Sequence, residues 1–192
     1  MENLLGIKRI NGSYQKSKKP ILINDLKLII KAIDQDKDVE YKKIRNKSMI
    51  LIGFSGGFRR TELVNLEYDD LEFVSEGVKI FIKRSKTDQS GEGSIKAIPY
   101  FNNLEYCPVK KLKDWIYYKK ITSGKIFNIS DKSVSLIIKK YALLAGLNPN
   151  KYGGHSLRSG FATSAAEAGA EERNIMAMTG HKTTQMVRRY IR

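Results

Sequence analysis

The chain has 192 residues, of which 41% are apolar, so it is long enough for one domain with a buried core and too apolar for wholesale disorder. Its 35 lysines and arginines outnumber its 20 aspartates and glutamates, which gives a net charge of +15. This excess favours nucleic acid as the first candidate partner and a membrane surface as the second. The alternative is a surface that is rich in lysine only because the gene is rich in A and T.

The chain begins with a basic stretch over 1–20 that is rich in Gly, Ser and Asn and ends at Pro20, which predicts a tail or linker. From Ile21 onward, apolar residues recur at three- and four-residue steps, which predicts a helix with Asn24 as a possible cap. Further helices are predicted over 40–55, 59–66, 108–121, 130–145, 155–168, 171–179 and from 183 or 184 onward.

Between Tyr68 and Tyr100 the apolar period shifts towards two, which predicts strands over 71–74, 78–82 and 95–98. The polar stretch 85–94 contains glycines and is the expected hairpin loop. We therefore expect an α+β fold that is mainly α-helical, with a small three-stranded antiparallel sheet, in one domain over 21–192.

Cys107 is the single cysteine, which excludes an intramolecular disulfide and a zinc site built on thiolates. No apolar run approaches the roughly 20 residues of a membrane span, and residues 1–14 lack the apolar core of a signal peptide. We expect a cytoplasmic protein without a membrane partner.

The first candidate site residue is Arg59, which follows the glycine pair at 56–57 and is expected in the first turn of its helix. Glu62 lies one turn further along and within reach. A buried arginine needs an acidic or phosphate partner, whereas an exposed Arg–Glu pair would be an ordinary surface feature of a helix. The local sequence leaves both interpretations open.

His155 and Arg158 open a predicted helix directly after the glycine pair at 153–154. Backbone N–H groups at a helix start attract phosphate oxygens, a histidine can move a proton near neutral pH, and an arginine can donate two hydrogen bonds to one phosphate. The alternative is a histidine cap followed by a solvated arginine.

His181 and Tyr190 are nine residues apart, which on one straight helix would put them on opposite faces. Gly180 argues against a continuous helix. We expect His181 in a turn and Tyr190 on a new helix, so that both can face one pocket. Taken alone, Tyr190 would be a packing residue and Lys86 a solvated lysine of the hairpin loop.

Together these residues occur in the order Arg59, Lys86, His155, Arg158, His181 and Tyr190. Residues 57–63 read Gly-Phe-Arg-Arg-Thr-Glu-Leu, and Thr-Gly-His precedes the Arg-Arg-Tyr near the end of the chain. This order and these motifs resemble the tyrosine recombinases, also called the phage integrase family, over about residues 21–192.

The resemblance implies a catalytic domain in which Arg59 and Arg158 hold the non-bridging oxygens of a DNA phosphodiester and Glu62 supports the arginines. It implies that Tyr190 is the nucleophile and leaves a 3′-phosphotyrosine. A phenol has a pKa near 10, so this attack requires nearby positive charge and a proton acceptor.

The resemblance further implies that Lys86 protonates the departing 5′ oxygen, that His155 assists proton transfer and that His181 hydrogen-bonds the phosphate. The sequence has no compact cluster of acidic residues for Mg²⁺, and we expect neither a metal nor another cofactor. Arg188 and Arg189 are expected to contact phosphate or support the structure rather than to catalyse.

Family members usually carry an N-terminal DNA-clamping domain and a segment after the tyrosine, and the sequence suggests an isolated catalytic domain without them. The expected partner is double-stranded DNA, with a homotetramer for the full-length protein and a monomer for this chain. The leading hypothesis is a site-specific recombinase. A catalytically inactive DNA-binding remnant, and a type IB topoisomerase or telomere resolvase, remain alternatives.

Overall fold

The computed structural model describes residues 18–83, 93–188 and 190. Its sheet consists of β1 (Leu71–Val74), β2 (Gly77–Ile82) and β3 (Ser94–Pro99), and short 3-10 turns occupy Tyr68–Asp70 and Pro149–Lys151. The helices are α2 (Ile23–Gln35), α3 (Glu40–Ser55), α4 (Arg60–Val64), α5 (Pro108–Lys119), α6 (Asp131–Leu144), α7 (His155–Glu167), α8 (Glu172–Thr179) and α9 (Thr184–Arg188). The expected α+β fold with a small antiparallel sheet is confirmed.

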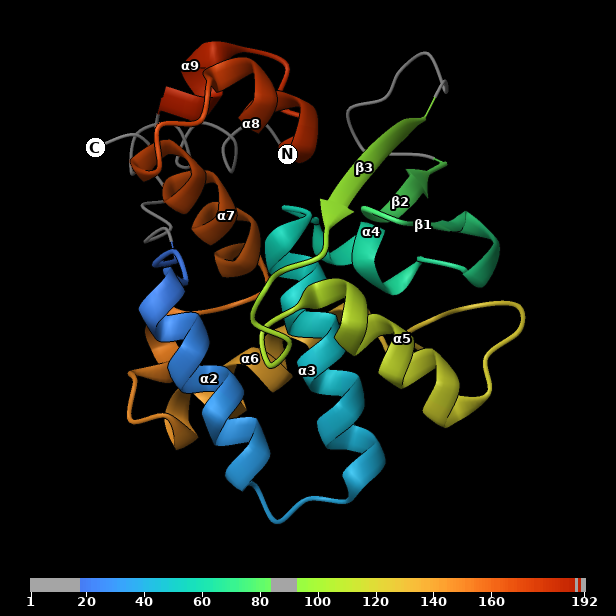
Figure 1. Ribbon diagram of the computed structural model, residues 1–192. Helices are drawn as coiled ribbons and strands as arrows, with labels where there is room; N and C mark the ends of the chain where they lie inside the picture. Colours follow the sequence, from blue (N-terminus) through green and yellow to red (C-terminus); the bar gives the residue numbers. More distant parts are fainter. Residues whose placement is uncertain (1–17, 84–92, 189, 191–192) are drawn as a thin grey trace, which may run out of the picture.

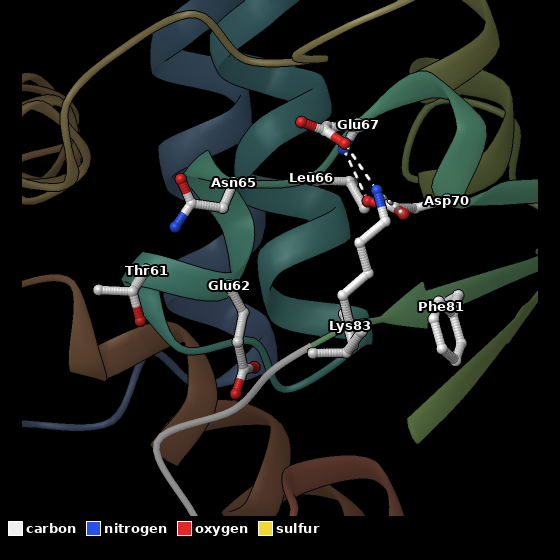
Figure 2. A pocket seen from close by; sticks show the side chains of 9 residues that line it. Thr61, Glu62, Asn65, Leu66, Glu67, Asp70, Phe81 and Lys83 are labelled. Atoms are coloured by element: carbon white, nitrogen blue, oxygen red, sulfur yellow. Dashed lines mark hydrogen bonds and ion pairs between the residues drawn. The ribbon is translucent and has the colours of Figure 1, made fainter. Parts of the chain in front are cut away.

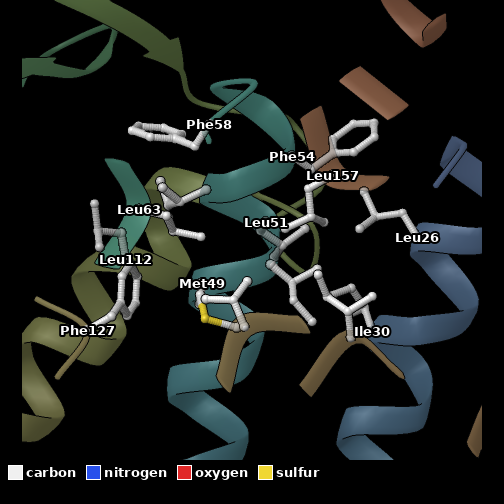
Figure 3. Close-up of a cluster of buried hydrophobic side chains, with 14 of the residues drawn as sticks. Leu26, Ile30, Met49, Leu51, Phe54, Phe58, Leu63, Leu112, Phe127 and Leu157 are labelled. Carbon is white, nitrogen blue, oxygen red and sulfur yellow. The ribbon is translucent and has the colours of Figure 1, made fainter. Parts of the chain in front are cut away.

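The helix α3 forms the centre of the domain. Every residue from Ser48 to Ser55 is buried, as in a helix that is surrounded by other elements on all sides. Figure 3 shows its side chains between those of α2, α4, α5 and α7. Because this half of α3 is enclosed on all sides, the turn that follows it is fixed relative to the rest of the core.

The sheet has the order β1-β2-β3, with both pairs antiparallel. Figure 1 shows it to one side of the helices, while α8 and α9 lie together at one end of α7. Alternation along β2 buries Val78, Ile80 and Ile82 and exposes the residues between them. In β3 the buried positions are Lys96 and Ile98, so a lysine faces the interior.

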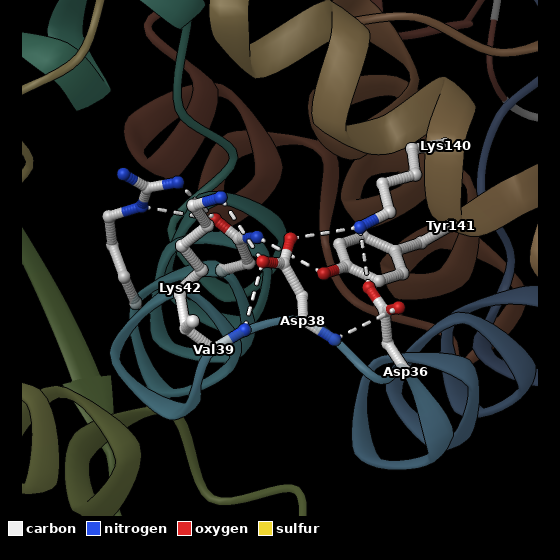
Figure 4. Close-up of polar contacts among 8 residues, drawn as sticks. Asp36, Asp38, Val39, Lys42, Lys140 and Tyr141 are labelled. Atoms are coloured by element: carbon white, nitrogen blue, oxygen red, sulfur yellow. Dashed lines mark hydrogen bonds and ion pairs between the residues drawn. The ribbon is translucent and has the colours of Figure 1, made fainter.

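The loop between α2 and α3 is tied to α6 by charged groups (Figure 4). The Lys140 ammonium contacts Asp36 at 2.5 Å and Asp38 at 3.0 Å. Hydrogen bonds from Lys140, Lys42 and the Val39 backbone lower the pKa of Asp38 to about 2. Exposed pairs of this kind contribute little to stability, so their main effect is to orient the loop.

The structure corrects the expected cap of the first helix. The helix α2 begins at Ile23 with Leu22 as its N-cap, and no side chain caps it. Asn24 therefore lies inside the first turn. Burial of Leu26, Ile29 and Ile33 on the core-facing side holds this helix instead. Within the described residues, no helix is long and apolar enough to cross a bilayer.

A close backbone contact joins the start of α2 to the middle of α7. The Ile21 amide donates to the Ser156 carbonyl at 2.9 Å, and the space beside Gly160 is filled by the backbone of Ile21. A Cβ at Gly160 would lie 2.0 Å from the Ile21 carbonyl oxygen. Glycine is therefore required at this position although it weakens a helix.

We predict that Gly160→Ala destabilises the protein by about 1–3 kcal/mol, because the overlap outweighs the roughly 1 kcal/mol that alanine contributes to a helix. Urea unfolding followed by circular dichroism measures the change. Gly153→Ala is the matched control, because the nearest atom to its Cβ would be 3.7 Å away. Equal stability of Gly160→Ala and the unsubstituted protein would contradict the close contact.

Candidate active site

The site begins at the turn between α3 and α4. Gly57 adopts a φ of +56°, which disfavours other residues, and a Cβ there would lie 3.0 Å from Phe161 and 3.1 Å from the Thr179 methyl group. The Gly57 carbonyl accepts a hydrogen bond of 3.0 Å from Arg158 Nη1. The turn is thus packed directly against α7 and α8.

Arg59 lies one residue before α4, as its N-cap, rather than in the first turn as expected. Its Nη1 contacts Glu62 Oε1 at 2.6 Å, and its backbone N–H donates to Glu62 Oε2 at 3.0 Å. Its Nη2 donates to the Gly180 carbonyl at 3.2 Å. Arg59 therefore connects α4 to the end of α8, and the predicted partnership with Glu62 is confirmed.

Arg158 is 2% exposed, so the alternative of a solvated arginine is wrong. Burial, together with the neighbouring charge of Arg59, lowers the pKa of its guanidinium to about 10, although Glu62 and Tyr190 act in the opposite direction. The group still carries its charge at neutral pH. A buried cation of this kind requires strong acceptors, and the Gly57 carbonyl satisfies part of that requirement.

His155 is the first residue of α7, as expected, and its Nε2 lies 3.2 Å from the Tyr190 hydroxyl. Tyr190 lies in a turn after α9, with its N–H donating to the Val187 carbonyl at 2.8 Å. The expectation that Tyr190 would be helical is therefore wrong.

His181 lies in the short connection between α8 and α9, outside both helices. Its ring stacks on that of Tyr190 with centroids 5.6 Å apart, and its Nδ1 is 2.8 Å from Thr179 Oγ1. Burial lowers the pKa of His181 to about 4, assisted by the positive charges of Arg158 and Arg59. The ring is neutral at pH 7.

His155 has a lowered pKa for the same reasons. Surrounding atoms desolvate its imidazolium form, and the charges of Arg158, Arg59 and Arg60 add to the effect. Its surface still faces solvent, in contrast to the buried Arg158. Both histidines are therefore favoured as neutral proton acceptors in the free protein.

Lys96 is a site residue that the sequence reading missed. Its ammonium donates to the Gly56 carbonyl at 2.9 Å and to the Met178 carbonyl, and it lies 5.0 Å from the Phe58 ring centroid. Burial lowers the pKa of Lys96 to about 8. Alternation along a strand places Lys96 on the same face as Ile98, and this could have indicated from the sequence that Lys96 points inward.

Lys86 lies outside the described residues. The strand end that precedes it is held by Lys83, whose ammonium contacts Glu67 at 2.6 Å and Asp70 at 3.0 Å. Figure 2 shows these contacts at the edge of a cavity of about 380 Å³ that Glu62 also lines.

The cluster is suited to an anion. Arg59, Arg158 and Lys96 bring three positive charges together, and Glu62 supplies one negative charge beside them. Such a group attracts a phosphate and stabilises charge that develops on it. Among the described residues no set of three or more His, Cys, Asp and Glu side chains could hold a metal ion.

We predict that His181 titrates near pH 4 in the free protein, below its ordinary 6.5. The C2–H signals of the two histidines report this in proton NMR, and His155→Gln identifies which signal is which. A His181 pKa at or above 6.5 would contradict the desolvated, cationic surroundings.

The same shift predicts how stability depends on pH. The unfolded chain binds a proton at His181 below about 6.5 and the folded chain only below about 4, so this contribution is complete above pH 6.5 and is lost as the pH falls towards 4. The difference in unfolding free energy between the unsubstituted protein and His181→Gln should therefore change within that window and remain constant above it.

Comparison with known proteins agrees with this geometry. The sequence pattern of the phage integrase family matches residues 21–192. An integrase/recombinase xerD homolog of Selenomonas ruminantium is 45% identical over 197 residues, covering 96% of this chain and 57% of that protein. Tyrosine recombinase XerD of Staphylococcus haemolyticus is 26% identical, covering 90% of this chain and 59% of that protein.

Solved structures show the same fold. XerH site-specific recombinase bound to palindromic difH substrate superposes with a TM-score of 0.76 at 19% identity, covering 93% of this chain and 51% of that chain. The Tn1549 transposon integrase with circular intermediate DNA gives a TM-score of 0.69 at 17% identity, covering 93% of this chain and 62% of that chain. The chain spans less than two thirds of each of these proteins and belongs to the phage integrase family of tyrosine recombinases.

Proposed function

We propose that the protein containing this chain is a site-specific DNA recombinase and that residues 21–192 are its catalytic domain. The observation that carries the proposal is the convergence of the Tyr190 hydroxyl with His155 at 3.2 Å and with the stacked ring of His181, beside the paired Arg59 and the buried Arg158. A phenol, proton acceptors and phosphate-binding cations are the groups that a tyrosine needs to attack a phosphodiester.

In the proposed reaction the Tyr190 oxygen forms a bond to the scissile phosphorus, and the bond from phosphorus to the 5′ oxygen breaks. The phenol proton passes to His155, whose Nε2 lies 3.2 Å from the hydroxyl. Lys86 supplies a proton to the departing 5′ oxygen. Arg59 and Arg158 hold the non-bridging oxygens. Attack by the 5′ hydroxyl of another strand on the phosphotyrosine then rejoins the DNA and releases Tyr190.

Glu62 has a positioning role in this proposal. It accepts from both the side chain and the backbone of Arg59, so it fixes the direction of that guanidinium. It also offsets part of the positive charge when no phosphate is bound. Its own burial, at 8% exposure, limits how far it can move.

The proposed substrate is double-stranded DNA in the cytoplasm of a prokaryotic cell. XerH and the Tn1549 integrase were solved with DNA, and the +15 charge of this chain agrees with such a partner. We propose a homotetramer on two duplexes for the full-length protein and a monomer for this chain alone.

We predict that Tyr190→Phe abolishes covalent capture of DNA while the protein still folds and binds DNA. A pool of nicked suicide duplexes with a randomised sequence traps the phosphotyrosine, and a denaturing gel shows the adduct. Tyr118→Phe is the matched control, because Tyr118 is an exposed tyrosine on α5 and should form as much adduct as the unsubstituted protein.

An adduct that persists in Tyr190→Phe would contradict the assignment of the nucleophile. DNA binding without any adduct, both for this chain and for the full-length protein, would favour an inactive DNA-binding remnant. Adducts that reseal only on their own strand would favour a type IB topoisomerase, and strand exchange between two sites identifies a recombinase.

A further inference from the structure

The side chain of Thr179 occupies a fully enclosed position at the end of α8. It is 0% exposed, so its hydroxyl cannot reach solvent. Its Oγ1 has two polar neighbours, the Ile175 carbonyl oxygen at 2.5 Å and His181 Nδ1 at 2.8 Å. The hydroxyl can donate its one hydrogen to only one of these two neighbours. This choice determines which nitrogen of His181 carries a proton.

The carbonyl oxygen of Ile175 can only accept a hydrogen bond. An oxygen–oxygen distance of 2.5 Å therefore requires that the Thr179 hydroxyl donates its single hydrogen to that carbonyl. The hydroxyl then has only lone pairs to offer to His181. The 2.8 Å contact is a hydrogen bond only if Nδ1 of His181 carries the hydrogen.

We propose that Thr179 is a positioning residue that keeps the proton of neutral His181 on Nδ1 and leaves Nε2 as a hydrogen-bond acceptor. Free histidine in water prefers the opposite form, with the proton on Nε2. The threonine therefore selects the less common tautomer by a single buried hydrogen bond.

The groups around His181 also favour its neutral form. Arg59, Arg158, Lys96 and His155 all act electrostatically on its ring, and Tyr190 stacks on it. The cations oppose a second proton on the ring as long as no anion is present. In the free protein, His181 therefore presents a lone pair at Nε2 rather than an N–H.

This has a mechanistic result that rests on the proposed function. Neutral His181 cannot donate from Nε2 to a phosphate oxygen, and it can do so only after it takes up a proton. A bound DNA phosphate would favour that uptake because it brings negative charge to the cluster. Engagement of DNA by this site is therefore coupled to proton uptake at His181.

The first test needs no DNA and no activity. Long-range proton–nitrogen NMR of the folded, free chain at pH 7 distinguishes a protonated from an unprotonated ring nitrogen for each histidine. The chain has only two histidines, so His155→Gln assigns the signals. We expect His181 with the proton on Nδ1, and a proton on Nε2 would overturn the proposal.

Two variants separate the hydrogen bond from the shape of the side chain. Thr179→Val keeps the shape and removes the acceptor, so His181 should shift to the Nε2-protonated form. Thr179→Ser restores the hydroxyl and should restore the Nδ1-protonated form. An unchanged tautomer in Thr179→Val, or no recovery in Thr179→Ser, would show that another group sets the proton position.

The second test counts the protons that the protein takes up when it binds DNA. Titration calorimetry in buffers of different ionisation enthalpy gives this number. The probe is the DNA duplex that forms the covalent adduct with Tyr190 in the suicide-substrate experiment. Uptake should be greater for the unsubstituted protein and Thr179→Ser than for Thr179→Val, whose neutral ring can already donate from Nε2. Equal uptake in all three would overturn the coupling. Because the tautomer is measured without DNA, it is judged separately from the proposed recombinase activity.

Discussion

The burial of the Arg158 guanidinium against the turn at Gly57 is the constraint on which the rest of the site depends. A cation that is 2% exposed is tolerated only where fixed acceptors surround it, and the Gly57 carbonyl provides one at 3.0 Å. That carbonyl is available because the turn follows α3, whose last eight residues are all buried. The central helix α3 thus determines where the Arg158 guanidinium lies. Arg59 follows Gly57 by two residues, so the same turn also positions Arg59.

The site carries an electrostatic cost that its ligand would relieve. Burial, with the nearby positive charges, lowers the pKa of Lys96 and of Arg158, and the same two causes lower the pKa of both histidines. Glu62 offsets part of this repulsion. A phosphate would offset more of this repulsion, so the cluster is suited to bind an anion.

Four separate parts of the chain meet here. The turn before α4 supplies Arg59, β3 supplies Lys96, α7 supplies His155 and Arg158, and the segment after α8 supplies His181 and Tyr190. Lys96 contacts backbone carbonyls at the end of α3 and at the end of α8, so it joins two of these parts directly. The sheet therefore contributes to the site through the buried side chain of Lys96.

The sequence by itself determined the features that depend on neighbours within one or two turns. Apolar periods located the helices and strands, the glycine pair located the start of α7 at His155, and the spacing of Arg59 and Glu62 predicted their pairing. Each follows from backbone geometry that is the same wherever such a segment occurs. The order of the charged residues and the final tyrosine also carried the family resemblance.

Tertiary structure alone decided which polar groups are buried. The burial of Arg158, the inward face of Lys96, the enclosure of Thr179 and the turn that carries Tyr190 depend on elements more than 30 residues away or on the packing of α8 and α9. The cap expected at Asn24 failed for a related reason, because apolar burial fixed the start of α2 without a side-chain acceptor. Burial sets the cost of a charge and the place of a proton, and no local pattern of residues specifies it.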